Sequence, residues 1–227
     1  MMKKYALFGL VLMLFTVAAA GCGLLSEPAA PSTELEAAPV AVDEASGSGG
    51  AAVYVIDPAA SQVRFELNEV LRGNPITVVG STDQVAGEIA LDLNDLSTVQ
   101  LGTIQVNARG LATDNNFRNR AINNEILQTG DYEFITFVPS GIGGLPAGAA
   151  VGDTVEFSVN GDLTIRDITQ PVTFNVTATV ASDSQIEGTA SAVVQRADYN
   201  LVIPQVPNVA NVEEEVELYL DFVANAS

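Results

Sequence analysis

Residues 155–180 read VEFSVNGDLTIRDITQPVTFNVTATV, and nearly every second residue of this stretch is apolar. The apolar residues occupy odd positions before the corner at 166–171 and even positions after it. Successive side chains of a β-strand point to opposite sides, so a period of two is typical of strands with one dry face. The stretch therefore predicts two long strands. We expect the first to bend at Gly161 rather than to turn there, because its apolar phase continues unbroken to Ile165.

The same alternation recurs along the chain after residue 50. Further strands are predicted at 63–67, 89–93, 104–109, 133–139, 185–196 and 216–224. About eight such strands, separated by corners that carry Gly, Asn and Asp, indicate an all-β antiparallel domain. The pattern alone leaves two architectures open, a closed barrel and a sandwich.

One stretch, residues 111–132, interrupts the strand rhythm and predicts a short helix over one mouth of a barrel. Asp114 or Asn115 is expected to cap the start of the helix, and Gly130 is expected to end it. Its many Asn residues make it a weak helix former, so packing must hold it in place. The expected buried face consists of Phe117, Ala121, Ile122 and Ile126.

The N-terminus predicts where the protein works. Lys3 and Lys4 precede an apolar run, 6–20, of the length of a signal-peptide core. The sequence Ala19-Ala20-Gly21-Cys22 that follows resembles a bacterial lipobox. We expect a lipoprotein signal peptide at 1–21 and acylation of Cys22, the alternative being a free or core cysteine. The expected location is extracytoplasmic, anchored by lipid to a membrane on the periplasmic side or at the cell surface.

Residues 22–50 predict a lipidated cysteine followed by a disordered tether. The segment is rich in Ala, Pro, Ser, Gly and Glu and lacks periodic apolar residues. A flexible chain of this length spans on the order of 30 Å, which would hold the globular part clear of the lipid headgroups. Residues 51–227 then form one domain of ordinary size.

Charge and composition exclude several classes of function. Residues 51–227 contain seven Arg, no Lys and 23 acidic residues, a net charge of −16, so nucleic acid and anionic membrane surfaces are not expected partners. The whole chain has no His, and its one cysteine is Cys22. Nucleophile–His pairs and the usual zinc ligands are therefore missing, and we expect no catalytic residue, no metal site and no enzymatic activity. Carboxylates at 92–95 leave calcium as an alternative.

Four groups of motifs resemble the bacterial YceI-like family, a lipocalin-like polyisoprenoid-binding domain, over residues 53–225. The resemblance implies an extended eight-stranded antiparallel lipocalin-like barrel with one short helix near a mouth, holding an isoprenoid or another long-chain lipid and no other cofactor. The motifs that carry it are Tyr54–Asp57 with Ser61–Phe65, Arg118 with Glu125–Phe137, Gly161–Arg166 with Thr169–Thr173, and Gln195–Tyr199.

The chain also departs from this family pattern. Ala60 and Ala121 stand where the family often has His, so no role of those histidines carries over. Asp167 and Asn200 stand where Gly is usual, and both residue types enter left-handed backbone conformations readily. Glu133 replaces a frequent Pro, a change expected to matter only locally.

The inward rows of the predicted strands carry apolar residues and no obvious charge. The interior of an eight-stranded barrel is wide enough to be filled by side chains or to hold one slender ligand. Two functions therefore remain open: a lipid-binding barrel, and a surface-displayed structural or protein-interaction barrel with a closed, ligand-free core. The candidate lipid-binding residues are Phe65, Phe137, Phe157, Phe174 and Phe222.

Arg118 and Arg196 are the candidate headgroup contacts, because they lie near the predicted helix and a corner. A domain with a net charge of −16 is a poor general trap for anions. We therefore expect a neutral, quinone-like isoprenoid in preference to an isoprenyl diphosphate. The sequence leaves the oligomeric state open, a dimer included.

Overall fold

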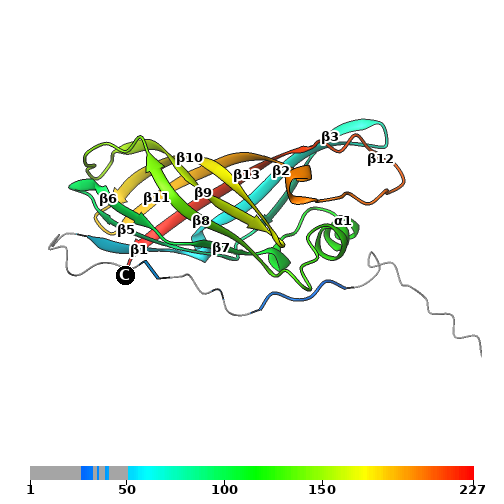
Figure 1. Ribbon diagram of the computed structural model, residues 1–227, viewed down its shortest axis with the longest axis horizontal. Coiled ribbons are helices and arrows are strands. Elements are labelled where there is room, and N and C mark those ends of the chain that lie inside the picture. The colour runs from blue at the N-terminus through cyan, green and yellow to red at the C-terminus, as the bar shows by residue number, and fades with distance from the viewer. Residues whose placement is uncertain (1–26, 33–34, 36–38, 41–50) are drawn as a thin grey trace, which may run out of the picture.

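The computed structural model describes residues 27–32, 35, 39–40 and 51–227 (Figure 1). The expected signal peptide, Cys22 and most of the expected tether lie outside these residues. Within the described ranges, no helix is both long enough and apolar enough to cross a membrane.

The domain is built from one antiparallel sheet of thirteen strand segments and, among the described residues, one α-helix. Helix α1, Asn116–Ala121, continues directly into a π-helical turn, Ile122–Ile126. The strands are β1 Ala52–Ile56, β2 Gln62–Leu71, β3 Asn74–Thr82, β4 Val85–Ala86, β5 Glu88–Asp92, β6 Asp95–Leu101, β7 Ile104–Asn107, β8 Phe134–Gly143, β9 Thr154–Ile165, β10 Ile168–Ser182, β11 Gln185–Gln195, β12 Val209–Ala210 and β13 Glu215–Ala226.

The sheet is curled rather than flat (Figure 1). Strands β7, β8, β9, β10, β11 and β13 are neighbours in that order, and β13 also pairs with β2, which pairs with β3. Strand β3 leads into β4, which pairs with β7, and Ser81 on β3 bridges to Ala112. The predicted all-β barrel is confirmed. Its segments outnumber the expected eight because β1, β5 and β6 extend the sheet past this ring and β4 and β12 are two-residue pieces.

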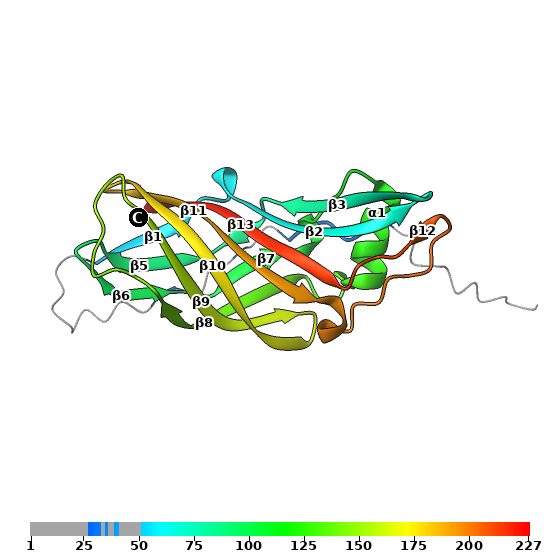
Figure 2. The ribbon, with the colours of Figure 1, turned by 90° about the horizontal axis from the view of Figure 1, so that it is seen from above.

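The barrel is elongated, with α1, the β2–β3 hairpin and β12 at one end (Figures 1 and 2). The C-terminus lies toward the opposite end, where β1, β5 and β6 pair. Buried apolar side chains from most strands form one continuous core inside the sheet. The most deeply buried residues of this core include Tyr54, Val85 and Ala224, each at most 1% exposed.

The stretch 155–180 forms the two long strands that its alternation predicts. β9 runs through Gly161 without a turn, and β9 and β10 pair from Thr154↔Thr179 to Ile165↔Ile168. The corner between them is a two-residue hairpin in which Arg166 has a φ of 58°. At this corner the left-handed residue is Arg166, the first residue of the turn, and Asp167 is not left-handed. The expectation for Asn200 is confirmed, with a φ of 50°.

The sequence does not predict β3, because Gly80 and Thr82 interrupt the apolar row on its inward face. Val78, Gly80 and Thr82 are the buried residues of this strand, so its apolar alternation is weak. A Cβ atom on Gly80 would overlap the aromatic ring of Phe65 on the neighbouring strand. The ring of Phe65 thus fills the space that a side chain of β3 would otherwise occupy.

Candidate functional site: an apolar cavity with a polar mouth

A cavity of about 690 Å³ lies inside the barrel. Its lining comes mainly from apolar residues of β2, β7 to β11, β13 and α1. The barrel interior is therefore open rather than filled. All five aromatic residues singled out in the sequence line it, namely Phe65, Phe137, Phe157, Phe174 and Phe222. Their contact with a lipid remains a prediction.

The aromatic side chains form part of a shaped wall. The rings of Phe137 and Phe174 meet edge to face, with centroids 4.9 Å apart and planes at 72°. This is a favourable geometry for aromatic pairs. Phe137 is buried, whereas Phe157 and Phe174 are only half-buried. Because these half-buried residues line the cavity, they offer apolar surface to a ligand.

Polar side chains gather at one end of the cavity, which we call the mouth. They come from the end of β2, the start of α1 and the segment 201–208 that precedes β12. Figures 1 and 2 show these elements together at one end of the barrel. The polar residues of the mouth are Glu69, Arg72, Asn115, Arg118 and Asn208.

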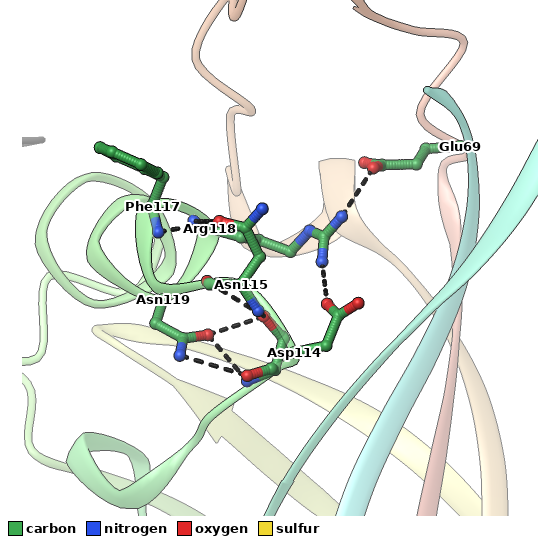
Figure 3. Close-up of polar contacts among 7 residues, drawn as sticks. Glu69, Asp114, Asn115, Phe117, Arg118 and Asn119 are labelled. Atoms are coloured by element: carbon green, nitrogen blue, oxygen red, sulfur yellow. Dashed lines mark hydrogen bonds and ion pairs between the residues drawn. The ribbon is translucent and has the colours of Figure 1, made fainter. Parts of the chain in front are cut away.

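Helix α1 is fixed at the mouth by its N-terminal cap. The side chain of Asn115 accepts hydrogen bonds from the backbone N–H groups of Phe117 and Arg118, at 2.9 and 3.2 Å. The side chain of Asn119 accepts the backbone N–H of Thr113 at 2.7 Å, which holds the preceding loop against the helix (Figure 3). Of the two predicted caps, Asn115 is the one that the structure shows.

Two expectations for the helix are wrong. Phe117, expected on the buried face, is 71% exposed, while Ala121 and Ile122 are buried as predicted. The helix does not extend to Gly130, because the π turn ends at Ile126 and Gln128 already has a φ of 51°. A helix of this length buries one narrow stripe, which here contains Ala121 and Ile122 and leaves out Phe117.

Arg118 lies between two carboxylates at the mouth (Figure 3). Its guanidinium is 3.0 Å from the carboxylate of Glu69 and 2.6 Å from that of Asp114. Glu69 is buried, whereas the Asp114 side chain is 88% exposed. Arg118 lines the cavity with its charge already balanced, and its contact with a lipid headgroup stays a prediction.

Glu69 corrects the expectation that the inward rows carry no charge. It continues the inward phase of Val63, Phe65 and Leu67, because β2 extends to Leu71. The predicted strand ended at residue 67, two inward positions too early, because Glu69 and Leu71 both follow in the same phase. Counting the period of two as far as residue 69 would have placed this carboxylate inside the barrel.

Arg196, the second candidate headgroup contact, also lines the cavity but is occupied by the protein itself. Its side chain is buried and donates to the backbone carbonyls of Leu201, Val212 and Glu213 at 2.7 to 3.3 Å. A further bond of 2.8 Å goes to the carboxylate of Glu214. Arg196 thus holds both ends of segment 201–212, and its contact with a ligand stays a prediction.

Arg72 is a cation of the mouth that sequence reasoning missed. It is exposed in the tight turn between β2 and β3, where its φ is 52° and that of Gly73 is 84°. Its backbone N–H donates to the carbonyl of Asn208 at 2.8 Å, which ties the hairpin tip to segment 201–208. Among the described residues, no carboxylate forms an ion pair with its guanidinium.

The segment before the barrel contacts its outer surface. The backbone N–H of Ser32 donates to the carboxylate of Glu133 at 2.7 Å. Glu27 forms an ion pair of 3.2 Å with Arg120 on α1, and the N–H of Val40 donates to Glu88 at 3.0 Å. At these points the chain lies along the barrel, which its composition did not predict.

Glu133 is the centre of this contact. Its carboxylate also accepts a hydrogen bond of 2.7 Å from Asn107 and lies 2.8 Å from the guanidinium of Arg109. Burial alone would raise the pKa of Glu133, but the bonds from Ser32 and Asn107 and the charge of Arg109 hold that pKa below its usual value. The expectation that Glu133 matters only locally is wrong, since it joins segments 26 and 101 residues away.

In the part of the chain that the structure describes, no three His, Cys, Asp or Glu side chains are grouped as a metal site requires. The carboxylates of Asp92 and Asp95 instead accept hydrogen bonds from Asn94 and Ser97 in their own turns. The absence of a metal and of catalysis stays a prediction.

Comparison with known proteins identifies relatives of the whole domain. The family model of the YceI-like domain matches residues 54–224. A UPF0312 protein of Staphylococcus aureus strain MRSA252 is 29% identical over 139 residues, which are 60% of this chain and 70% of that protein. A second, from strain MSSA476, is 26% identical over 158 residues, 65% of this chain and 81% of that protein.

Solved structures share the fold. A polyisoprenoid binding domain from Saccharophagus degradans, implicated in plant cell wall breakdown, has a TM-score of 0.62 at 16% identity and covers 77% of this chain and 98% of its own. BcnA of Burkholderia cenocepacia has a TM-score of 0.60 at 20% identity, covering 75% of this chain and 99% of its own. At these identities the likeness concerns the fold alone.

Proposed function

We propose that this chain, which belongs to the YceI-like domain family, is a membrane-tethered extracytoplasmic protein that holds one long-chain isoprenoid inside its barrel. The observation that carries the proposal is the apolar cavity of about 690 Å³. Its volume falls within the range of about 300–1,000 Å³ that small-molecule sites occupy. A scaffold with a closed core would have no use for such a space, which argues against the structural alternative.

The charges at the mouth favour a neutral, quinone-like lipid. A diphosphate needs several cations with free donors, yet Arg118 is paired with Glu69 and Asp114, and exposed Arg72 alone is left without an ion pair among the described residues of the mouth. The donors of Arg196 are engaged by backbone carbonyls and by Glu214. A neutral carbonyl or hydroxyl head requires no displacement of these carboxylates. We therefore propose that Arg118 and Arg196, if they contact the lipid headgroup, contact an uncharged carbonyl or hydroxyl group.

The tether belongs to the proposal through Cys22 and the lipobox-like residues before it. Peptide mass analysis of the chain expressed in bacteria tests it. We expect the mature protein to begin at Cys22 and to carry acyl chains there. An unmodified Cys22, or a chain that retains residues 1–21, would contradict the tether without affecting the cavity.

A competition experiment tests the ligand class. The purified full chain is offered an equimolar mixture of a neutral isoprenoid quinone and an isoprenyl diphosphate of equal chain length in detergent micelles, and the complexes are counted by native mass spectrometry. We expect the quinone complex to dominate. Predominant binding of the diphosphate would overturn the preference for a neutral head, and binding of neither would overturn the lipid-binding proposal.

A further inference from the structure

Exposed apolar side chains cluster at the mouth of the cavity. Phe117 on α1 and Val202 on segment 201–208 are 71% and 74% exposed, the two highest values among the large apolar residues that the structure describes. Val206 on the same segment is also exposed and, like Phe117, lines the cavity. Exposed apolar patches of soluble domains mark interaction sites. We call Phe117, Val202 and Val206 the apolar rim.

Cys22, the membrane anchor that the sequence predicts, is only five residues from Glu27 in the chain. Glu27 is bound to Arg120 on α1, the helix that carries Phe117. The five residues from Cys22 to Glu27 span at most about 18 Å when fully extended. A bilayer that holds acyl chains on Cys22 is therefore confined to the α1 end of the barrel whenever the pair Glu27–Arg120 is formed.

The charges around the rim indicate what kind of surface it fits. Arg72 is exposed at the mouth without an ion pair among the described residues, while Asp114 and Glu213 are acidic groups of the same end. The domain as a whole carries a charge of −16. An anionic surface would repel it, whereas a zwitterionic surface offers phosphates to Arg72 without a net negative charge.

We infer that the mouth of the cavity rests on the zwitterionic bilayer to which Cys22 is anchored, with the apolar rim inserted among the lipid headgroups. The inference rests on the proposed function, since it needs both the anchor and a lipid cargo. An isoprenoid then passes between the bilayer and the cavity without entering water. Exposure of a hydrocarbon chain to water would cost free energy. While Glu27 is paired with Arg120, the five residues from Cys22 to Glu27 are too few to hold the α1 end of the barrel far from the bilayer.

Single tryptophans test the orientation, because the chain has no Trp of its own. The full chain carrying Phe117→Trp is placed in phosphatidylcholine vesicles that contain brominated phosphatidylcholine, a quencher within the bilayer. We expect strong quenching of this Trp. Val193→Trp is the matched control, because Val193 is 59% exposed on β11 and is not part of the rim. Equal quenching of the two, or none at Phe117→Trp, would overturn the inference.

Transfer rates test the consequence and separate it from lipid binding itself. In the variant Val202→Asp, at a rim residue that does not line the cavity, uptake of an isoprenoid quinone from phosphatidylcholine vesicles should fall about tenfold, because carboxylates at lipid-facing positions are costly. Uptake from detergent micelles should not change. An unchanged vesicle rate would contradict membrane docking. Failure of the wild type to load from micelles would instead refute the proposed function, and the quenching experiment would still decide the docking.

Discussion

The guanidinium of Arg118 on α1 lies 3.0 Å from the carboxylate of Glu69 on β2 (Figure 3). This ion pair connects the one α-helix of the described chain to the barrel wall at the mouth of the cavity. It places a buried carboxylate in an otherwise apolar row, where its charge needs a partner.

Removal of Arg118 should therefore be costly. In Arg118→Met the carboxylate of Glu69 is left buried without its cation, and we expect a loss of about 3 kcal/mol in the free energy of unfolding, measured by urea titration. Asp114→Ala removes the exposed partner and should cost about 0–1 kcal/mol. Adding Glu69→Gln to Arg118→Met should restore much of the loss. A double variant no more stable than Arg118→Met would contradict the role assigned to this pair.

Filling the cavity should lower its lipid content. In Phe157→Trp a larger ring occupies space that a ligand needs, so the fraction of protein that co-purifies with lipid should fall, as measured by native mass spectrometry. Val138→Trp is the control, because Val138 lies on β8 and is 48% exposed. A lipid load unchanged in Phe157→Trp, or lowered equally in both variants, would show that Phe157 does not face the ligand.

Gly161 should not tolerate a side chain. A Cβ atom there would lie 2.5 Å from both the ring of Phe137 and the backbone oxygen of Val138, and backbone does not move aside easily. We expect Gly161→Ala to lose about 1–3 kcal/mol in thermal or urea unfolding. Gly141→Ala, with no heavy atom within 4 Å of its Cβ, should unfold like the wild type or slightly later. Equal stabilities of the two variants would refute the close approach of β8 and β9 at Gly161.

The contact between Ser32 and Glu133 should weaken in acid. A carboxyl whose pKa is lowered in the folded state stabilises its contacts fully above its unfolded pKa of about 4.3, and this contribution is lost as the pH falls through the lower, folded value. The amide proton of Ser32 should therefore shift in NMR spectra only below about pH 4. Glu133→Gln should abolish that titration. A midpoint above the ordinary value of a glutamate would contradict the assigned hydrogen bonds.

Much of the barrel follows from local alternation, since each strand reveals its dry face within a few residues. The rows that contain Phe157 and Phe174 illustrate this, and both residues line the cavity. The inward position of Glu69 was not predicted, because the predicted strand stopped at residue 67. Strand β3 was not predicted, because the ring of Phe65 fills the space next to Gly80, where the strand lacks a side chain. Glu69 could have been placed by continuing the same count, whereas β3 required knowledge of the neighbouring strand β2.

The local sequence pattern does not predict the contacts at the mouth of the cavity or those of the N-terminal segment. Phe117 and Ala121 are four residues apart on one helix, yet Phe117 is exposed and Ala121 is buried, a difference that periodicity alone does not indicate. The bond from Ser32 to Glu133 joins residues 101 positions apart. The family resemblance helped with the barrel, because its motifs lie on the strands. It did not help with Glu133, which departs from the family pattern.

The most direct test of the lipid-binding claim is native mass spectrometry of the full chain purified from bacterial cells, followed by organic extraction and identification of what is released. The cavity predicts a folded protein that carries one neutral isoprenoid per chain, released when the barrel is denatured. A folded protein whose mass equals that of the mature chain alone, and which takes up no isoprenoid when one is supplied, would contradict it.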